Sequence, residues 1–236
     1  MKSYSILFLF FILSAAAFAQ ENTFSFDLFN AKMERSFLTV RDKKNVIIYS
    51  RQFKNPSAGV ADLDNDNINE FLVTDSETKG GMIFYTLYIF NTIDSFYLAD
   101  SIDSGVIKPY DIYSKELKSI MIVTGNPKFN LFNTDSADVC LPSNCWSYES
   151  GKISGVNGKL YDFYIAENDT LIDTIDSYLE NNPKDCNTSN ELKAFIASVY
   201  ANYLQAGDKI LARQFLRNYY FCKDAESFKN KIISLL

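Results

Sequence analysis

One short stretch, ADLDNDNINEFLV (residues 61–73), collects oxygen donors at alternate positions. The donors are the carboxylates of Asp62, Asp64 and Asp66, the backbone carbonyl of Ile68, and the carboxylate of Glu70. Hard cations such as Ca²⁺ take six to eight oxygen ligands, and a tight turn supplies them from few residues. Three alternating aspartates repel one another unless a cation lies between them. We therefore expect a Ca²⁺ site here, with a solvated acidic turn as the alternative.

The residue between the third aspartate and the predicted carbonyl ligand is Asn67. Calcium loops usually carry glycine there because the backbone needs a positive φ, and Asn tolerates that conformation best after glycine. An EF-hand is excluded, since its closing bidentate acid is replaced by Val73 and a strand pattern follows instead of a helix.

Strand patterns dominate from Phe24 to about Ile172 and define a β-rich domain over residues 20–175. Short aromatic and β-branched runs alternate with Asn, Asp, Gly, Ser and Pro clusters, which predicts antiparallel sheets. The runs are FSFDLF, SFLTV, NVIIYS, EFLVTD, MIFYTLYIFN, SFYLADSI, SIMIVTG, FNLFN, CWSYES and LYDFYIA. In residues 82–91 both faces are apolar, which is typical of a central strand.

A weak internal repeat runs through this region. FLVTD at 71–75 matches MIVTG at 121–125, and each is followed by a Phe-Asn pair, at 90–91 and 132–133. A period near ~50 residues is typical of propeller blades, but the roughly 150 residues here are too few for a closed propeller. A partial propeller and an open sandwich both remain possible, as does a chance match.

The stretch GVADLDNDNINEFLVTD resembles the calcium-binding repeat of integrin-α-like propellers, of the FG-GAP or VCBS type. That repeat has the pattern Asp-x-Asp-x-Asp-Gly-x-x-Asp/Glu beside an apolar strand. The acidic loop followed by YTLYIF and FYLADSI is also similar to small periplasmic proteins that bind or inhibit lysozyme-like enzymes. These resemblances imply that a cation ties a hairpin together and shapes a binding face.

Residues 176–236 are expected to form a helical hairpin and a terminal helix. Thr188 and Glu191 fit a capping box, Gly207 ends the first helix, Asp208 caps the second, and the third runs from about Ala225 to Leu235. The hairpin resembles one tetratricopeptide-type repeat. A single repeat cannot form a solenoid groove, so we expect an appendage packed on the β domain.

The four cysteines suggest disulfides. We expect Cys186–Cys222 to close the helical hairpin and Cys140–Cys145 to close a small loop. Four thiolates on one zinc ion is the alternative, but short paired C-x-x-C spacings are missing. Trp146 is expected to pack against the second disulfide, the alternative being an exposed ligand platform.

Residues 1–19 read as a cleaved secretory signal peptide. A lysine precedes an apolar run that ends in Ala17-Phe18-Ala19. The run is shorter than the ~20 residues that span a bilayer, although a membrane anchor is the alternative. No second long apolar stretch follows, so we expect a periplasmic or secreted protein without a membrane span.

Composition narrows the function. The chain has no histidine, which removes histidine-based triads and most zinc sites. Its net charge of −6 argues against a nucleic-acid partner. We expect a non-catalytic module that binds another protein or a cell-envelope glycan. The alternatives are an inhibitor of a cell-wall hydrolase and a two-carboxylate glycan hydrolase, for which the spacing selects no acid pair.

Overall fold

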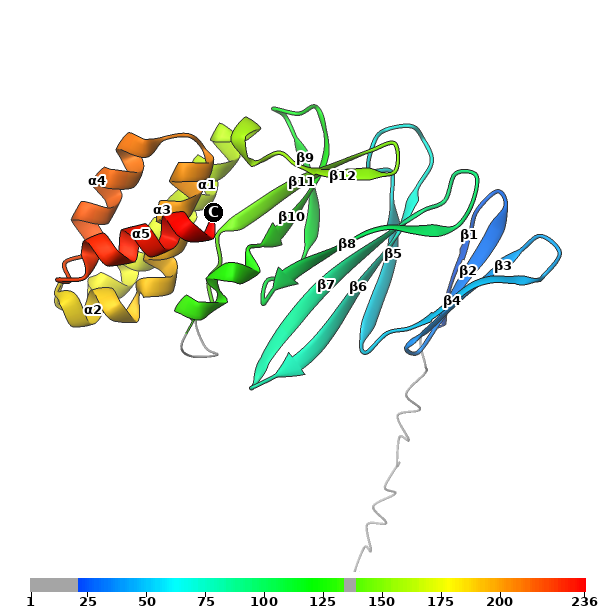
Figure 1. The fold of residues 1–236 in the computed structure, drawn as a ribbon, viewed down its shortest axis with the longest axis horizontal. Coiled ribbons are helices and arrows are strands. Elements are labelled where there is room, and N and C mark those ends of the chain that lie inside the picture. Colours follow the sequence, from blue (N-terminus) through cyan, green and yellow to red (C-terminus); the bar gives the residue numbers. More distant parts are fainter. Residues whose placement is uncertain (1–20, 134–138) are drawn as a thin grey trace, which may run out of the picture.

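The computed structural model describes residues 21–133 and 139–236, where three antiparallel sheets precede a group of helices (Figure 1). Sheet A contains β1 (Glu21–Ser25), β2 (Phe29–Glu34), β3 (Phe37–Asp42) and β4 (Ile47–Gln52). Sheet B contains β5 (Pro56–Ala61), β6 (Glu70–Lys79), β7 (Met82–Asn91) and β8 (Tyr97–Gly105). Sheet C contains β9 (Tyr110–Ser114), β10 (Ser119–Gly125), β11 (Ser143–Glu149) and β12 (Lys152–Gly155). The expected class, mainly β with a helical C-terminal part, is confirmed. The predicted signal peptide lies outside the described residues.

Within each sheet the strands pair in chain order, so every sheet is a meander of neighbouring hairpins. The two matching segments, 71–75 and 121–125, lie in β6 and β10, which are the second strands of sheets B and C. Consecutive four-stranded meanders are typical of propeller blades. In Figure 1 the described sheets follow one another in a row and do not close into a ring.

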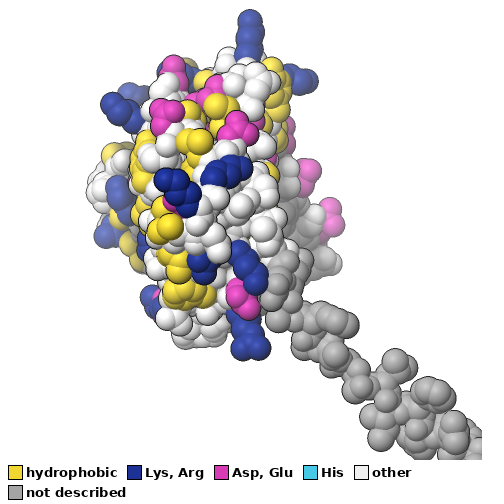
Figure 2. Space-filling model, turned by 90° about the vertical axis from the view of Figure 1, so that its right-hand side faces the viewer, with side chains coloured by type: hydrophobic (Ala, Val, Ile, Leu, Met, Phe, Trp, Pro, Cys, Tyr) yellow, Lys and Arg dark blue, Asp and Glu magenta, His cyan; other side chains and the backbone are white. Residues whose placement is uncertain are grey.

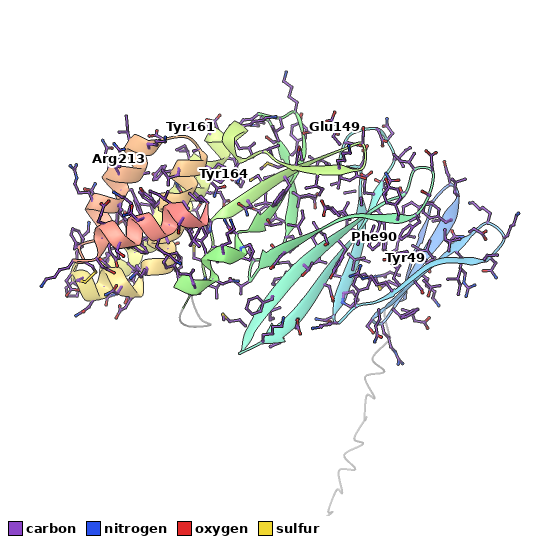
Figure 3. All side chains as sticks on the ribbon, viewed as in Figure 1. Tyr49, Phe90, Glu149, Tyr161, Tyr164 and Arg213 are labelled. Atoms are coloured by element: carbon purple, nitrogen blue, oxygen red, sulfur yellow. A yellow bond between two sulfur atoms is a disulfide. The ribbon has the colours of Figure 1, made fainter. Side chains whose placement is uncertain are left out.

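Sheet B is the central layer, because side chains of β7 pack on both faces. Tyr88 and Phe90 join an apolar cluster with sheet A, whereas Leu87 and Ile89 join one with sheet C. The rings of Phe90 and Tyr49 of β4 point toward one another, with centroids 5.5 Å apart (Figure 3). Burial of each large apolar side chain contributes about 1.5–3 kcal/mol. The expected central strand at 82–91 is confirmed.

The other face of sheet C packs against the helices. Ile122 of β10 points toward sheet B, while its neighbours Met121 and Val123 face the opposite way. There they meet Tyr164 of the first helix, α1 (Tyr161–Leu179), which is fully buried (Figure 3). The order of layers is therefore sheet A, sheet B, sheet C and helices.

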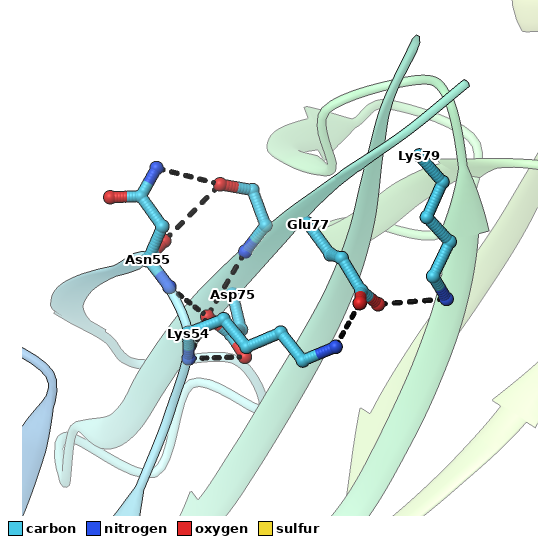
Figure 4. A network of polar contacts seen from close by, with 6 residues as sticks. Lys54, Asn55, Asp75, Glu77 and Lys79 are labelled. Atoms are coloured by element: carbon cyan, nitrogen blue, oxygen red, sulfur yellow. Dashed lines mark hydrogen bonds and ion pairs between the residues drawn. The ribbon is translucent and has the colours of Figure 1, made fainter. Parts of the chain in front are cut away.

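Asp75 fixes the crossing from sheet A to sheet B (Figure 4). Its Oδ1 accepts hydrogen bonds from the backbone N–H groups of Lys54, at 3.0 Å, and Asn55, at 2.8 Å. The Lys54 ammonium also pairs with Glu77, which contacts Lys79 at 2.7 Å on its other side. Exposed ion pairs contribute at most about 1 kcal/mol, so the backbone bonds to Asp75 set the geometry.

The remaining helices are α2 (Cys186–Glu191), α3 (Lys193–Gln205), α4 (Lys209–Tyr219) and α5 (Ala225–Leu235). Gly207 takes φ +83° after α3, and the Asp208 carboxylate accepts from the N–H groups of Ile210 and Leu211 at the start of α4. The expected stop, cap and terminal helix are confirmed. None of the described helices has the length and apolarity needed to cross a membrane.

Two predicted strands are wrong, and a third, FSFDLF at 24–29, spans the turn between β1 and β2 instead of forming one strand. The run LYDFYIA belongs to α1, so the change from strands to helices comes at Tyr161, earlier than the expected boundary at 175. Tyr164, Asn168 and Ile175 are buried at helical spacing, a pattern that becomes visible only beyond the first seven residues. The run FNLFN lies largely in a 3₁₀ helix, η1 (Pro127–Phe132), which Asn126 caps by accepting from the Lys128 N–H. A second 3₁₀ turn, η2 (Asn157–Lys159), precedes α1.

The expected capping box is also wrong. Asp185 caps α2 by accepting from the N–H of Thr188 at 3.0 Å, which places Thr188 inside the helix. An aspartate three residues upstream therefore competes successfully with the threonine for the exposed backbone donors.

The Cys186–Cys222 disulfide is confirmed, and the Cys140–Cys145 disulfide is wrong. Cys145 lies in β11, where the Tyr164 hydroxyl donates to its sulfur at 3.6 Å. Cys140 lies in the apolar cluster of the helices instead. Burial raises the pKa of both free thiols to about 12, so they are protonated. Trp146 consequently has no disulfide to pack against.

Charge is unevenly spread along the molecule. Residues 21–52, which form sheet A and its turns, contain six Lys or Arg and four Asp or Glu. Figure 2 looks onto this end, where lysines and arginines lie among exposed apolar side chains. The acidic excess is therefore carried by the rest of the chain, which includes the acidic loop.

Candidate metal centre

The acidic loop connects β5 to β6 within sheet B, where Ala61 pairs with Glu70. Its backbone turns sharply, because both Asn65 (φ 60°) and Asn67 (φ 67°) take the left-handed conformation. The expected positive φ at Asn67 is confirmed. Asn65 has the same conformation, which the comparison with calcium loops did not predict.

Aspartate side chains hold the loop in this shape. The two carboxylate oxygens of Asp62 accept from the backbone N–H groups of Asp66, at 3.1 Å, and Asn67, at 3.0 Å. Asp66 Oδ1 accepts from the N–H of Ile68 at 2.7 Å. Short aspartate side chains commonly stabilise turns in this way. Asp62 and Asp66 therefore have a role in the loop even without an ion.

The structure brings three of the five predicted ligands together. Asp62, Asp64 and Glu70 each place one carboxylate oxygen within 4.8 Å of the other two. Asp66 and Ile68 lie in the exposed part of the turn and are not in this group. Three carboxylate oxygens at such separations suit a divalent cation of the size and hardness of Ca²⁺.

Glu70 is the most unusual of these residues, since it is fully buried. Its Oε2 accepts from the N–H of Leu63 at 3.0 Å, but its Oε1 is buried and has no hydrogen-bond partner among the described residues. The pKa of Glu70 is raised to about 7, mainly by burial; the nearby carboxylates of Asp64 and Asp66 act in the same direction, and the hydrogen bond from Leu63 opposes them. A buried carboxylate with a free oxygen costs free energy unless a proton or a cation neutralises it.

Asp64 links this loop to sheet C. Its Oδ2 accepts from the backbone N–H of Ser150 at 3.1 Å, and its Oδ1 is buried without a partner in the described part of the chain. Ser150 lies in the turn between β11 and β12, next to Glu149 (Figure 3). Sequence reasoning missed Ser150 because 86 residues separate the two and no local pattern connects them.

Two further residues border the site. Tyr148 is buried, and its burial, together with the negative charges of Glu70 and Asp64, raises the pKa of its phenol to about 12. The amide nitrogen of Asn91 donates to the Tyr148 hydroxyl at 3.4 Å. The hydroxyl is therefore a neutral oxygen beside the carboxylates. In the sequence, Asn91 stands out only as part of a repeat, and no pattern marks Tyr148 as a site residue.

One other carboxyl has a raised pKa, but it lies elsewhere. Burial raises the pKa of Glu167 on α1, whose Oε2 accepts from the Ser143 hydroxyl at 3.2 Å. Glu167 packs between α1 and sheet C and does not line the main clefts of the described structure.

Comparison with known proteins gives no relatives. No protein-family model matches the chain, and searches of curated proteins and of solved structures find no significant match. The resemblance to FG-GAP or VCBS repeats and to lysozyme inhibitors therefore stays a prediction.

Proposed function

We propose that the protein is an exported, non-catalytic binding module in which one Ca²⁺ ion stabilises the β5–β6 loop. Its partner is another protein or a cell-envelope polymer. The ion is held by Asp62, Asp64 and Glu70, with the Ile68 carbonyl and Asp66 as further ligands after a small rearrangement of the turn.

The observation that carries the calcium proposal is the buried Glu70. An unpaired carboxylate oxygen in an apolar setting is unfavourable on its own, and the partner-free Oδ1 of Asp64 adds a second acceptor without a donor. One divalent cation satisfies both groups and cancels their repulsion. In a turn without an ion, burial of Glu70 Oε1 and Asp64 Oδ1 would bring no stabilisation.

The ion has a structural role in this proposal. Asp64 connects the loop of sheet B to the β11–β12 turn of sheet C, so a cation that fixes Asp64 also fixes the contact between the sheets. The placement of Glu167 supports a non-catalytic function, because a general acid must reach the substrate. Export rests on the sequence of residues 1–19.

One observation favours the inhibitor of a cell-wall hydrolase as a second candidate. A cleft beside the loop is lined by Asp64, Asp66, Asp94 and Glu149. Asp94 and Glu149 are not proposed ligands of the ion, so these two carboxylates are available to attract lysine and arginine side chains, as an inhibitor of a basic enzyme requires. Inhibition of a basic lysozyme by the wild-type protein would support this candidate, provided that a Glu149→Gln variant inhibits the enzyme less strongly.

Calorimetric titration of the purified protein with Ca²⁺ tests the main proposal. We expect binding of one ion, a melting temperature that rises with Ca²⁺, and loss of both effects in Asp64→Ala. Asp94→Ala is the matched control, because Asp94 is exposed in the neighbouring cleft and is not a proposed ligand. Absence of heat and of a melting shift in the wild type would make the loop an acidic turn without an ion.

A further inference from the structure

We propose that the groove beside Trp146 is a binding site for a neutral oligosaccharide. This groove is separate from the metal centre and has a volume of about 420 Å³, within the range of ligand sites. It lies between β8 of sheet B and the β11–β12 hairpin of sheet C, with the start of η1 along one side. The inference rests on the proposed function as a binding module, but not on the Ca²⁺ ion.

Trp146 supplies a fixed aromatic surface. Its indole N–H donates to the Thr124 hydroxyl at 2.9 Å, and this hydrogen bond fixes the orientation of the ring. Its cross-strand partner on β12 is Gly155, which has no side chain to cover the ring. A Cβ atom added at Gly155 would meet only the edge of the indole, at 4.0 Å. A half-buried, immobilised indole beside an open position suits stacking against the apolar face of a sugar ring.

Polar groups around the ring remain available for hydroxyl groups. Asp100 and Asp103 each use Oδ1 to accept from the backbone, from Ser101 and Gly105, and within the described residues their Oδ2 atoms have no partner. These free oxygens accept hydrogen bonds, and the exposed ammonium of Lys128 donates them.

Asn126 adds a hydrogen-bond donor to the groove. The residue as a whole is 6% exposed and lines the groove. The Oδ1 atom is used to cap η1, whereas the amide nitrogen has no hydrogen-bond partner in the described part of the chain. This nitrogen is not one of the fully buried unpaired atoms, so it is open to the groove, where a sugar hydroxyl can both accept from it and donate to an aspartate.

The combination distinguishes a neutral sugar from other ligands. Two carboxylates beside one lysine disfavour an anion such as phosphate. A groove with one aromatic ring and many hydrogen-bonding groups is also too polar for a purely apolar ligand. A sugar ring, with apolar faces and a hydroxyl rim, matches both parts of the groove.

The single tryptophan of the chain makes the test direct. Tryptophan emission is followed while chito-, cello- and malto-oligosaccharides are added to the full-length protein, in Ca²⁺ and in chelator. We expect a saturable change in emission with at least one of them. Gly155→Val, which covers the ring, should weaken binding about tenfold or more, and Asp100→Ala should weaken it about fivefold.

Gly158→Val is the matched control, because Gly158 has open space around it and does not line the groove. It should bind as the wild type does. The groove assignment is overturned if no oligosaccharide changes the emission of the folded protein, or if Gly155→Val binds normally. Sedimentation with purified cell-wall polymer and Ca²⁺ calorimetry report separately on the proposed function. If sedimentation and calorimetry are positive but tryptophan emission does not change, only the oligosaccharide site in the groove is rejected.

Discussion

Asp64, in the loop of sheet B, accepts a hydrogen bond from the backbone N–H of Ser150, in the β11–β12 turn of sheet C, at 3.1 Å. The same carboxylate has a second oxygen that is buried and unpaired. The residue that contacts sheet C is therefore also one of the three acids that could bind an ion. If Ca²⁺ orders Asp64, its effect must reach the neighbouring sheet.

Ca²⁺ should slow amide hydrogen exchange at Ser150 as well as at Leu63, which donates to Glu70. The physical reason is that an ion bound to both carboxylates reduces the local opening that exposes these N–H groups. Exchange measured by mass spectrometry or NMR, with and without Ca²⁺, checks this. Asp64→Asn keeps an acceptor for Ser150 but loses charge, so it should abolish the calcium effect. Protection of Leu63 alone would show that the ion does not stabilise the contact between the sheets.

The Glu70→Gln substitution should stabilise the protein without Ca²⁺ and destabilise it with Ca²⁺. Without the ion, the buried charge of Glu70 costs stability, and the amide of Gln could donate to the unpaired Asp64 Oδ1. We therefore expect the variant to melt above the wild type in chelator near neutral pH. With Ca²⁺, the wild type should melt higher because it keeps the third carboxylate. A variant that melts lower in both conditions would contradict the proposed role of Glu70.

The pH dependence of the calcium-free protein follows from the same group. The pKa of Glu70 is raised from 4.5 to about 7, so the folded state holds its proton more tightly than the unfolded state. Its contribution to stability is complete below about pH 4.5 and is lost as pH rises through about 7, a change of roughly 3 kcal/mol. Chemical denaturation in chelator at a series of pH values measures this loss. Glu70→Gln should lack it, and equal slopes for both proteins would show that another group is responsible.

The sequence predicts much of the fold because its signals are local. Alternating apolar residues identify β7 and β10, and the Gly207-Asp208 pair identifies the break between α3 and α4. The strand expected at 160–166 failed because the first turns of α1 are rich in aromatic residues. The signal for the helix lies further on, in the spacing of Asn168 and Ile175.

The metal centre was predictable only in part. The alternating aspartates and Glu70 could be recognised because they are close in sequence. The burial of Glu70 and the contact with Ser150 depend on how sheets B and C pack, which no local pattern encodes. The Cys140–Cys145 disulfide failed for the same reason, since five residues of separation permit a bond but strand β11 turns Cys145 toward Tyr164.

Loss of the Cys186–Cys222 disulfide should destabilise the helical part. The bond closes a loop with a sequence separation of 36 residues, for which chain entropy predicts about 3–4 kcal/mol. Denaturation of a Cys186→Ser/Cys222→Ser double variant measures the loss. Cys140→Ala is the control for experiments with a reducing agent. The Cys140 thiol of the wild type is buried and free, so the reducing agent should destabilise the variant and the wild type equally. If reduction destabilised the wild type but not Cys140→Ala, Cys140 would be part of a disulfide in solution.

Phe90→Ala should detach sheet A from sheet B before the rest of the molecule unfolds. Phe90 is fully buried and contacts the rings of Tyr49, Phe71 and Phe96. Its truncation should cost about 3–5 kcal/mol. Because these rings form the cluster between sheets A and B, exchange should accelerate most in β3 and least in β10, which packs on the other side of sheet B. Ile83→Ala is the exposed control on the same strand, with an expected change within about 0.5 kcal/mol. Uniform acceleration in all three sheets would instead mean that they unfold as one cooperative unit.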